Sequence, residues 1–554
     1  MDNIRLFALG GLDEDGKNLY VVEINNDIIL IEAGLKYPEN EQLGVEMIIP
    51  DFSYLQKNKD RIKAIFITHA HDDVLGSLAY LIKQINIPIY TAPLTAAVIE
   101  HEMKKMGVDK YDIRIIKRSD NLKIGKIDVR TFGITTSIMD GFGLAIATSH
   151  GYIVYCGEFI IDSDIKLASF ASDVSEFAEI GKQGVFALLC ESNSADNKGY
   201  TAPNHRITDL VESHVENATG RIIITAYEQN LYRIIEIIEL ANKYRKRLFI
   251  YDEGLRSLLT LVEKLGYYKI PSRIDLPKSK FNNDLEDIIV LVTGNGPNVF
   301  RIMMKIAMGE DETVTLDETD TVIIGSPSGD TLEVEASNTV NELYKENVKV
   351  VALDSHKVYS IHAASEDLKM MIYLFKPKYY VPVKGEYRHL VDNANIALDM
   401  GYRADHIVVL DNGQIATFEN GFLKTTSDLI DLNDVMIDGN DNSNISSFVL
   451  KDREVLSQDG AIIIGILINF NTKEVIGGPD VQSRGLIYLK DADYIVKEVG
   501  IILEDTIKEA VAANRFENMA VRMEAKDRIT RYLLKETGKR PMILPTIVEI
   551  NITN

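Results

Sequence analysis

Two histidines and two aspartates lie within five residues of the chain, at His69, His71, Asp72 and Asp73. They follow the apolar run 64–68, whose β-branched and aromatic side chains predict a strand buried on both faces. Imidazoles separated by one residue place two nitrogen donors on one side of a turn, as zinc-type sites require. The residue types and their spacing therefore predict a metal site at the end of this strand.

The elements around this segment alternate between strands and helices, which predicts an α/β layered fold. The pattern restarts at about residue 216 as a compact α/β unit, which we interpret as an inserted domain, and the first pattern resumes after His356. The later part of the chain has a polar, turn-rich stretch, which we interpret as a linker. Further strands are expected at 406–410, 413–418, 461–469, 486–489 and 542–548, and the linker-like stretch lies at 437–446.

Composition limits the function classes. The 554 residues include 60 Lys and Arg against 83 Asp and Glu, a net charge of −23. This balance argues against nonspecific nucleic-acid binding by the whole surface, although a local basic channel is not excluded. Cys156 and Cys190 lie in apolar runs and are expected to be reduced core thiols. The longest apolar run, 460–470, is far shorter than the roughly 20 residues of a membrane span. A cytoplasmic protein without a membrane segment is therefore expected.

Six segments spread over the whole chain resemble one family. They are FALGGL at 7–12, ILIEAGLK at 29–36, PDFSY at 50–54, FKPKYYVPVKGEYR at 375–388, GPDVQSRG at 478–485 and RPMILP at 540–545. In this order they resemble ribonuclease J, a bacterial metallo-β-lactamase/β-CASP ribonuclease family. The resemblance implies an α/β fold: an αββα metallo-β-lactamase sandwich (1–215 and 346–430), an inserted α/β β-CASP domain (216–345), a linker (431–446) and a small α+β C-terminal domain (447–554).

The resemblance also implies a ligand set that can be compared position by position. Family members hold two divalent metal ions with five histidines and two aspartates, and the metals activate a water molecule that attacks the RNA phosphate. Four positions keep a usable side chain in this chain: His69, His71, Asp73 and, with glutamate in place of aspartate, Glu158. Three positions are lost: Val74, Thr136 and Lys384 each stand where the family has a histidine.

The substrate loop of the family is also altered here. It falls on Val358, Tyr359, Ser360, Ile361 and His362, where the family has His-Val-Ser-Gly-His. His362 keeps the position of a histidine that assists proton transfer in the family, and we interpret it as vestigial, because proton transfer needs an activated nucleophile. A β-branched residue in place of glycine restricts a loop that approaches phosphate closely.

Lys384 suggests how such a site remains stable. Without a metal, Asp73 and Glu158 would be two like charges a few ångströms apart, which is unfavourable. We predict that the ammonium of Lys384 lies near the place of the second metal and neutralises this pair. A lysine directed toward solvent would contradict this prediction. Glu32 stands where the family has an aspartate, and its longer side chain is expected to displace a contact that supports the metal ligands.

Two main functions therefore remain open, beside a third in which the chain is an adaptor that binds no RNA. In the first, the chain resembles the second, active-site-degenerate ribonuclease J paralogue of low-GC Gram-positive bacteria. It would bind no metal, be inactive or very weak, and act in RNA processing and decay as a structural or regulatory subunit. Its partners would be RNA and an active ribonuclease J paralogue, or a second copy of itself. In the second, it is a ribonuclease that uses at most one zinc or manganese ion, held by His69, His71 and Glu158.

Overall fold

The computed structural model describes residues 2–38, 44–326, 328, 332–354, 357–438, 443–444, 447–486 and 493–551. The chain divides into two compact units. One contains Met1–Lys36 and Ile49–Asp434, and the other contains Tyr37–Ile48 and Val435–Asn554. Both mix helices and strands, so the α/β class predicted from the alternation of elements is confirmed.

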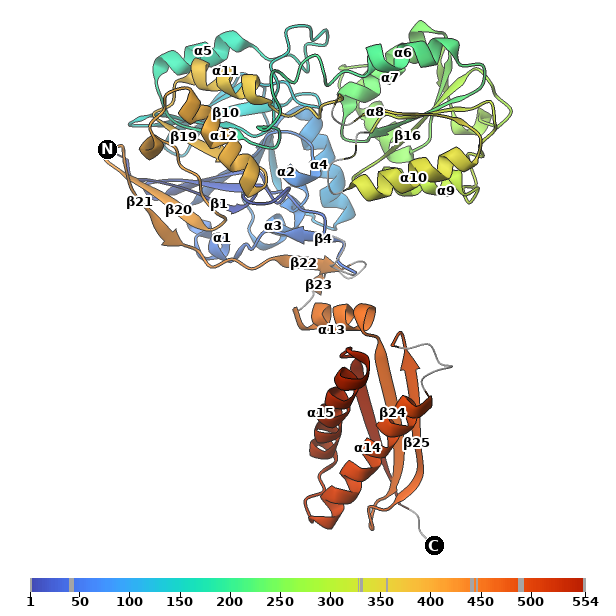
Figure 1. The fold of residues 1–554 in the computed structure, drawn as a ribbon. Coiled ribbons are helices and arrows are strands. Elements are labelled where there is room, and N and C mark those ends of the chain that lie inside the picture. Colours follow the sequence, from blue (N-terminus) through green and yellow to red (C-terminus); the bar gives the residue numbers. More distant parts are fainter. Residues whose placement is uncertain are drawn as a thin grey trace. The chain divides into compact units, whose positions relative to one another are not determined.

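Two sheets packed face to face form one part of the larger unit (Figure 1). The first has the order β21-β20-β1-β2-β3-β5-β6-β7 and the second the order β19-β12-β11-β10-β9-β8. Apolar side chains from both sheets, such as Leu6 and Leu144, share one buried core. The bounds are β1 Ile4–Gly10, β2 Leu19–Ile24, β3 Asp27–Ile31, β5 Ile62–Ile67, β6 Pro88–Thr91, β7 Asp112–Ile115, β8 Asn121–Ile124, β9 Ile127–Gly133, β10 Phe142–Thr148, β11 Gly151–Cys156, β12 Val185–Glu191, β19 Tyr379–Val383, β20 Gln414–Glu419 and β21 Phe422–Leu429.

Helices complete the four layers of this sandwich. The outer face of the second sheet packs against α5, α11 and α12, which contribute Phe177, Met371 and Ile396 to a second core. Shorter helices accompany the first sheet. The bounds are α1 Ser53–Lys57, α2 Asp72–Leu75, α3 Leu78–Gln84, α4 Pro93–Lys105, α5 Val174–Gln183, α11 Ser365–Phe375 and α12 Tyr387–Asp399.

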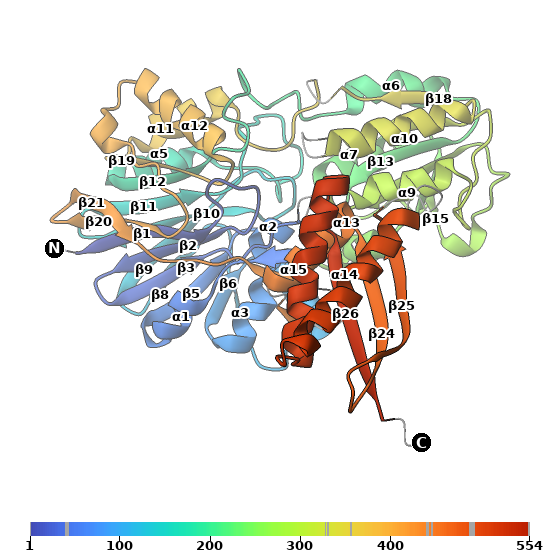
Figure 2. The same ribbon diagram turned by 60° about the horizontal axis from the view of Figure 1, so that its bottom comes forward.

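A third sheet, entirely parallel, is built from the part of the chain between β12 and β19. Its order is β15-β14-β16-β13-β17-β18. Helices pack on it, with α9 and α10 side by side in Figure 2 and both contributing to its core. The bounds are β13 Ile222–Tyr227, β14 Arg247–Ile250, β15 Asp275–Leu276, β16 Ile288–Gly294, β17 Thr321–Ile324, β18 Lys349–Ala352, α6 Thr208–Asn217, α7 Leu231–Lys243, α8 Glu253–Lys264, α9 Asn298–Ala307 and α10 Glu333–Lys345.

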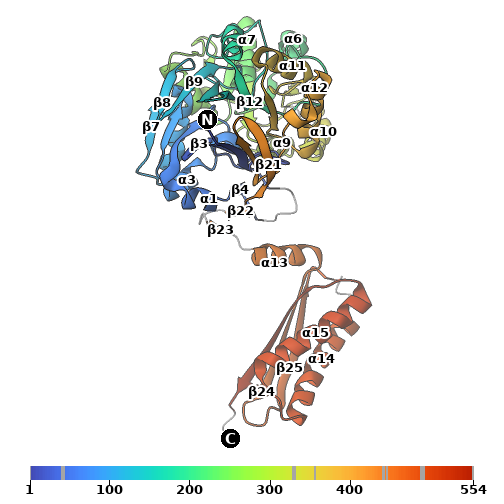
Figure 3. The same cartoon turned by 90° about the vertical axis from the view of Figure 1, so that its left-hand side faces the viewer.

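The second unit has two small sheets. One has the order β23-β22-β4, so a strand from the start of the chain pairs with one near residue 435. The other, β25-β24-β26, packs one face on α14 and α15 (Figure 3). The bounds are β4 Met47–Ile49, β22 Val435–Asp438, β23 Ser443–Asn444, α13 Ser447–Gln458, β24 Ala461–Asn469, β25 Val475–Arg484, α14 Asp493–Ala512, α15 Asn518–Thr537 and β26 Met542–Ile550.

Some predicted elements differ from the structure. The strand expected at 406–410 is wrong: residues Ala404–His406 form a 3-10 helix, and only Ile407 makes a bridge, to Tyr380. Part of the expected linker, Val435–Asp438, is strand β22. Residues 439–442 and 445–446 of that linker, and 487–489 of the strand expected at 486–489, lie outside the described residues. The strand β25 was not predicted.

Two expectations from composition can be compared with the structure. Cys156 and Cys190 are free and fully buried, as predicted, on neighbouring positions of β11 and β12. In the described ranges, no helix has both the length and the apolar content needed to cross a membrane. The cytoplasmic location stays a prediction.

Candidate metal centre

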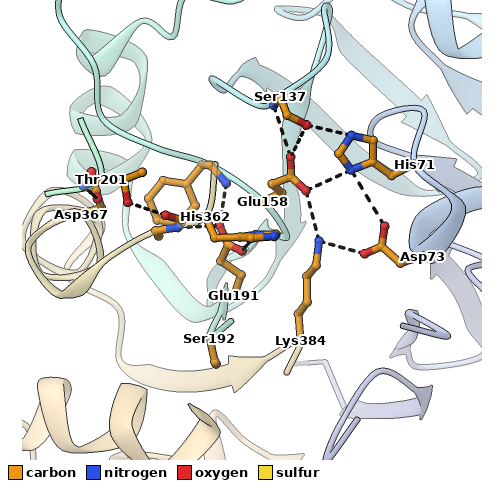
Figure 4. Close-up of polar contacts among 12 residues, drawn as sticks. His71, Asp73, Ser137, Glu158, Glu191, Ser192, Thr201, His362, Asp367 and Lys384 are labelled. Carbon is orange, nitrogen blue, oxygen red and sulfur yellow. Dashed lines mark hydrogen bonds and ion pairs between the residues drawn. The ribbon is translucent and has the colours of Figure 1, made fainter. Parts of the chain in front are cut away.

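The candidate site is assembled at one edge of the two packed sheets, where strands end. His69 and His71 follow β5, Glu158 follows β11, and Lys384 follows β19. β11, β12 and β19 run parallel to one another, so their carboxyl ends lie at the same edge. This arrangement explains how residues separated by more than 300 positions in sequence meet in one place (Figure 4).

Two imidazoles and one carboxylate converge on a common point. Oε2 of Glu158 lies 3.3 Å from Nε2 of His69 and 3.2 Å from Nδ1 of His71. The three residues are buried, and one ligand atom from each lies within 4.8 Å of the others. Two imidazole nitrogens and one carboxylate oxygen are a donor set that zinc and other first-row metals accept.

The predicted ion pairs of Lys384 are present. Its Nζ lies 3.0 Å from Oδ2 of Asp73 and 3.4 Å from Oε2 of Glu158. The side chain of Lys384 is 2% exposed and points toward Glu158 and Asp73 (Figure 4). One fixed positive charge therefore lies between the two carboxylates.

The charges of the site stabilise one another against burial. Burial alone would raise the pKa of Glu158, but the neighbouring His71, His69 and Lys384 hold it well below its ordinary value. Burial would lower the pKa of Lys384, but Asp73 and Glu158 raise it well above its ordinary value. At neutral pH both carboxylates are ionised and the ammonium is charged.

The two histidines respond differently to the same carboxylate. Burial lowers the pKa of His69 below its ordinary value despite the proximity of Glu158. Burial also acts against a charge on His71, but Glu158 and Asp73 outweigh it and raise the pKa of that imidazole. His69 is thus the more readily neutral of the two, the state in which an imidazole ligates metal.

Glu32 and Thr68 fix the orientation of His69. The Thr68 hydroxyl lies 2.6 Å from Oε1 of Glu32 and 2.8 Å from Nδ1 of His69. When Glu32 is ionised, Thr68 donates to it and accepts from Nδ1–H, so Nε2 of His69 is unprotonated. When Glu32 is protonated, its hydroxyl donates to Thr68, and Thr68 donates to Nδ1 of His69. Burial raises the pKa of Glu32 to about 8.

Two residues of the site have backbones in the left-handed region that glycine favours. Glu32 has φ +64° and Lys384 has φ +57°. Each is held there by backbone hydrogen bonds: Glu32 N–H donates to Phe66, and Lys384 N–H donates to Gly11 while its carbonyl accepts from Ser192. Such conformations cost about 1–3 kcal/mol outside glycine and persist only where surrounding contacts enforce them.

Two positions of the predicted ligand set contribute no ligand atom. Val74 is buried on α2 and its apolar side chain belongs to the core. Thr136 is also buried, and its hydroxyl donates to the carbonyl of Ile138 at 2.6 Å. Ser137, the next residue, is the one that faces the site: its hydroxyl lies 2.8 Å from Nε2 of His71 and 3.2 Å from Oε1 of Glu158.

The segment expected as the substrate loop lies beside the centre. Val358 and Ile361 are buried, whereas Ser360 is exposed and Tyr359 is half-buried. Nδ1 of His362 lies 2.7 Å from Oε2 of Glu191, and the other oxygen of Glu191 accepts from the backbone N–H of Phe159 and Ala363. Burial opposes a charge on His362, but Glu191 raises its pKa above the ordinary value.

Sequence reasoning did not identify Asn18, Ser137 and Glu191 as parts of the site. The Asn18 amide donates to the backbone carbonyl of Asp73 at 2.8 Å and to its Oδ2 at 3.0 Å. Glu191 carried a signal that could have been used, because it is a carboxylate at the end of the buried strand VFALLCE. Asn18 and Ser137 lie in polar turns, and nothing local to them indicates their distant partners.

The inserted parallel-sheet region contacts the same centre. The carbonyl of Gln229 lies 3.3 Å from Nε2 of His71, and Tyr232 N–H donates to the carbonyl of Ser137 at 3.0 Å. Tyr267 donates to Asp140 from the same region. The segment between β13 and α7 therefore covers His71, which is 8% exposed.

These residues fit one metal ion and not two. His69, His71 and Glu158 offer the three protein ligands of an open zinc site, with Nε2 of His69 and Nδ1 of His71 both directed at Oε2 of Glu158. Beyond them, the described residues offer Asp73, whose Oδ2 is already bonded to Lys384 and Asn18. An ammonium that is held this close to both carboxylates opposes a second divalent cation by charge repulsion.

Parts of this chain match the models of known protein families. Four family models match it: the metallo-beta-lactamase superfamily at residues 12–156, the ribonuclease J beta-CASP domain at 219–343, the Zn-dependent metallo-hydrolase RNA specificity domain at 347–406 and the ribonuclease J C-terminal domain at 448–550.

Full-length relatives agree with these models. Ribonuclease J 2 of Staphylococcus aureus (strain NCTC 8325) is 30% identical over 550 residues, which cover 99% of this chain and 98% of the relative. Ribonuclease J 2 of Staphylococcus epidermidis (strain ATCC 35984) is 30% identical over 554 residues, with the same coverage. A crystal structure of a protein of unknown function from Enterococcus faecalis V583 matches 75% of this chain and 100% of its own, with a TM-score of 0.51 and 16% identity, and shares the fold.

The packed sheets with histidines at one edge and the inserted parallel-sheet region define a metallo-β-lactamase fold with a β-CASP insertion. Matching relatives extend this class to both ends of the sequence. The chain belongs to the ribonuclease J family, a family of RNA-processing nucleases. The family expected from the six sequence segments is thereby confirmed.

Proposed function

We propose that this chain is a ribonuclease J-type protein of RNA processing and decay whose own site is inactive or very weak, and that it acts in the cytoplasm as a structural or regulatory subunit of an active ribonuclease J paralogue. The contact that supports this most directly is the placement of the Lys384 ammonium between Asp73 and Glu158. RNA is its expected ligand, as for its family.

The chemistry of the lysine carries the argument. Two-metal hydrolysis needs one cation to activate water and another to neutralise the charge that develops on phosphate. Lys384 neutralises Asp73 and Glu158 as a cation would, so the fold needs no second metal for its charge balance. An ammonium offers no empty coordination position, and therefore it cannot bind water and lower its pKa.

The domain division 1–215, 216–345, 346–430 and 447–554, with a linker at 431–446, belongs to the same proposal. It is supported by the family matches at 219–343 and 448–550. Under this division the site lies in the metallo-β-lactamase domain, with Glu158 and Lys384 contributed by its two separate parts. Val358–His362 would be the altered substrate loop, with His362 a vestige.

A second candidate function is a ribonuclease with one metal. It is favoured by the convergence of His69, His71 and Glu158. A zinc or manganese ion bound there would supply an activated water molecule and polarise a phosphoryl oxygen. In this chain, Ser137 would orient His71, Thr68 would orient His69, and Lys384 would remain next to Glu158.

Metal content decides between the two functions. The protein would be purified without chelators and without a metal-affinity column, and zinc and manganese per chain measured by elemental analysis. We expect near-zero metal and no degradation of a 5′-monophosphorylated RNA, for the unchanged chain and for a His69→Ala variant alike. One equivalent of metal that disappears in His69→Ala, together with RNA cleavage that disappears with it, would establish the single-metal nuclease instead.

A further inference from the structure

The inserted parallel sheet has a topological switch point between β13 and β16. These strands are neighbours, but α7 connects β13 to β14 on the far side of β16, and α9 connects β16 to β17 on the far side of β13. Parallel crossovers are right-handed, so α7 and α9 lie on opposite faces of the sheet. Open parallel sheets bind ligands outside the carboxyl ends of their strands at such a point. The residues that follow β13, β14 and β16 therefore form a candidate ligand site.

Two carboxylates lie together at this edge. Glu228 directly follows β13, and Asp252 lies two positions after the end of β14. Burial raises the pKa of Glu228 to about 7, and the nearby carboxylates of Asp252 and Asp72 add to the increase. Carboxylates that disfavour one another's charge in this way are stabilised by a cation between them.

Gly254, in the first turn of α8, leaves room between the two carboxylates. A Cβ at this position would stand 2.8 Å from Oδ1 of Asp252 and 3.3 Å from Oε1 of Glu228. The two oxygens therefore approach one point from two different strands. Asp252 is held in this position because its Oδ1 also accepts from the backbone N–H of Leu255 at 2.7 Å.

Thr293 supplies a buried hydroxyl at the same edge. The residue is fully buried, and its Oγ1 has no hydrogen-bond partner among the described residues. Val290 and Val292 of the same strand contribute to the core that includes α9. Alternate side chains of a strand point to opposite faces, so Thr293 points to the face that carries α7 and α8.

Strand register places this hydroxyl between the two carboxylates. Thr293 pairs with the residue two positions before Glu228. On its other side, Leu291 pairs with the residue two positions before Asp252, so Thr293 is level with Asp252. Side chains two positions apart on a strand share a face. Glu228, Asp252 and Thr293 therefore lie on one side of the sheet, at its carboxyl edge.

Asn295 adds a further oxygen. It follows β16, and its Nδ2 donates to Oδ2 of Asp72 at 3.4 Å. Its Oδ1 is buried and has no hydrogen-bond partner in the described part of the chain. The donor atoms at this edge are thus all oxygens, from two carboxylates, one amide and one hydroxyl. Magnesium and calcium prefer such ligands, whereas zinc favours nitrogen and sulfur.

We propose that Glu228, Asp252, Thr293 and Asn295 bind one hard divalent cation, magnesium or calcium, at the carboxyl edge of the inserted sheet. Glu228 and Asp252 are only partly buried, so a hydrated ion can reach them while Thr293 lies beneath. Magnesium in particular keeps several water molecules and takes one or two carboxylates from a protein.

Cation binding at this edge would also act on the cover of the candidate metal centre. Glu228 precedes Gln229, whose carbonyl lies 3.3 Å from Nε2 of His71. An ion that fixes Glu228 would hold this segment over His71. The all-oxygen site itself forms whether the histidine centre is active or not, because the two sites share no ligand.

Isothermal titration calorimetry of the full chain, stripped of metal with a chelator, tests the proposal with magnesium chloride and, separately, with calcium chloride. We expect one ion per chain with a dissociation constant of roughly 10⁻⁴–10⁻³ M, as for sites with few charged ligands. Glu228→Gln should weaken binding at least tenfold. The matched control is Glu253→Gln, at an exposed carboxylate beside Asp252 in the first turn of α8, which should change it less than twofold.

Gly254→Ala separates the site from the stability of the fold. Its methyl group would occupy the space between Asp252 and Glu228, whereas alanine favours a helix more than glycine does. Without cation, the melting temperature of this variant should equal or exceed that of the unchanged chain. Its affinity for the ion should nevertheless fall at least tenfold.

His69→Ala distinguishes the edge of the inserted sheet from the histidine centre, and should leave magnesium and calcium binding unchanged. The ratio of the two affinities identifies the preferred ion. Four results would each overturn the proposal. They are no binding of either ion up to about 10 mM, equal weakening by Glu228→Gln and Glu253→Gln, an unchanged affinity in Gly254→Ala, and a loss of binding in His69→Ala.

Discussion

At the scale of single residues, the charge balance around Lys384 has a measurable energetic consequence. Its ammonium and the Glu158 carboxylate are both 2% exposed, whereas the Asp73 side chain is 24% exposed. Removing one partner of a buried pair leaves the other charge buried without compensation, which costs about 3–5 kcal/mol. Lys384 is therefore expected to be a major contributor to the stability of this edge of the fold.

We expect Lys384→Met to lower the free energy of unfolding by about 3 kcal/mol, measured by urea denaturation. Adding Asp73→Asn removes one of the two uncompensated negative charges. The double variant should therefore recover about 1–2 kcal/mol relative to the sum of the two single changes.

The control for this cycle is Lys243→Met, at an exposed lysine that forms a surface ion pair with Glu212. Its effect should stay within about 0.5 kcal/mol. Strictly additive effects of Lys384→Met and Asp73→Asn would mean that the ammonium does not neutralise this carboxylate in solution.

Residue types indicated only part of the site in advance. His69, His71 and Asp73 lie within five residues of one another and were identifiable from the local sequence. Glu158 and Lys384 were identified through the family resemblance. The contacts of Asn18 and Glu191 were not predictable, because their partners lie 55 and 171 positions away. Such contacts depend on which strand ends meet, and that is decided by the packing of the whole sheet.

At the scale of elements, the pair formed by Glu191 and His362 joins the end of β12 to the loop before α11. Glu191 is fully buried, and its second oxygen accepts from two backbone N–H groups of separate segments. The carboxylate thus holds the loop and the β11–β12 edge together. This contact has a pH dependence of definite sign.

Because the folded pKa of His362 lies above its ordinary value of 6.5, the stability from this ion pair is fully present below about pH 6.5 and is lost as the pH rises through the folded value. We therefore expect His362→Asn to lower the free energy of unfolding by about 1–3 kcal/mol near pH 6 and by less near pH 9. Urea denaturation at the two pH values measures the difference.

The same substitution at His101, an exposed histidine of α4, is the control and should change the free energy of unfolding by less than about 0.5 kcal/mol. An equal loss of stability from His362→Asn at both pH values would indicate that only the packing of the imidazole is important.

Most elements were predictable from periodicity, and the exceptions have physical reasons. The run at 406–410 is mostly β-branched and apolar. Val408 and Leu410 are buried in the core, but the run pairs with a strand only through the single bridge of Ile407 to Tyr380. Strand β25 contains two glycines and a proline, which argue against a strand locally. Its pairing with the isoleucine-rich β24 overrides that preference.

At the scale of the whole molecule, the two units do not follow the order of the sequence. Residues 37–48 belong to the unit that otherwise begins at residue 435. Glu46 N–H donates to the carbonyl of Ile437, and Ile48 of β4 is 1% exposed. Dividing the chain after residue 434 therefore does not separate the two units, because residues 37–48 stay with the first piece.

This predicts different behaviour for two truncated chains. A chain that ends after Asp434 loses β22 and exposes the edge of β4, whereas a chain that ends after Asn444 keeps both β22 and β23. We expect the shorter chain to be less stable by about 2 kcal/mol for each apolar side chain uncovered, and to aggregate on concentration.

Thermal melting and light scattering compare the two truncated chains. Identical melting temperatures and no aggregation of the shorter chain would show that β22 contributes nothing to the cover of β4.

The same pairing has a consequence for synthesis of the protein on the ribosome. β4 ends at Ile49 and β22 begins at Val435, so about 385 residues are made between them, which takes roughly 20–80 s at about 5–20 residues per second. During this interval β4 has been translated and has no partner strand. An unpaired apolar edge is the kind of surface that chaperones bind and that starts aggregation. The nascent chain is therefore expected to be most vulnerable just before its last quarter emerges, long after its candidate metal ligands have been translated.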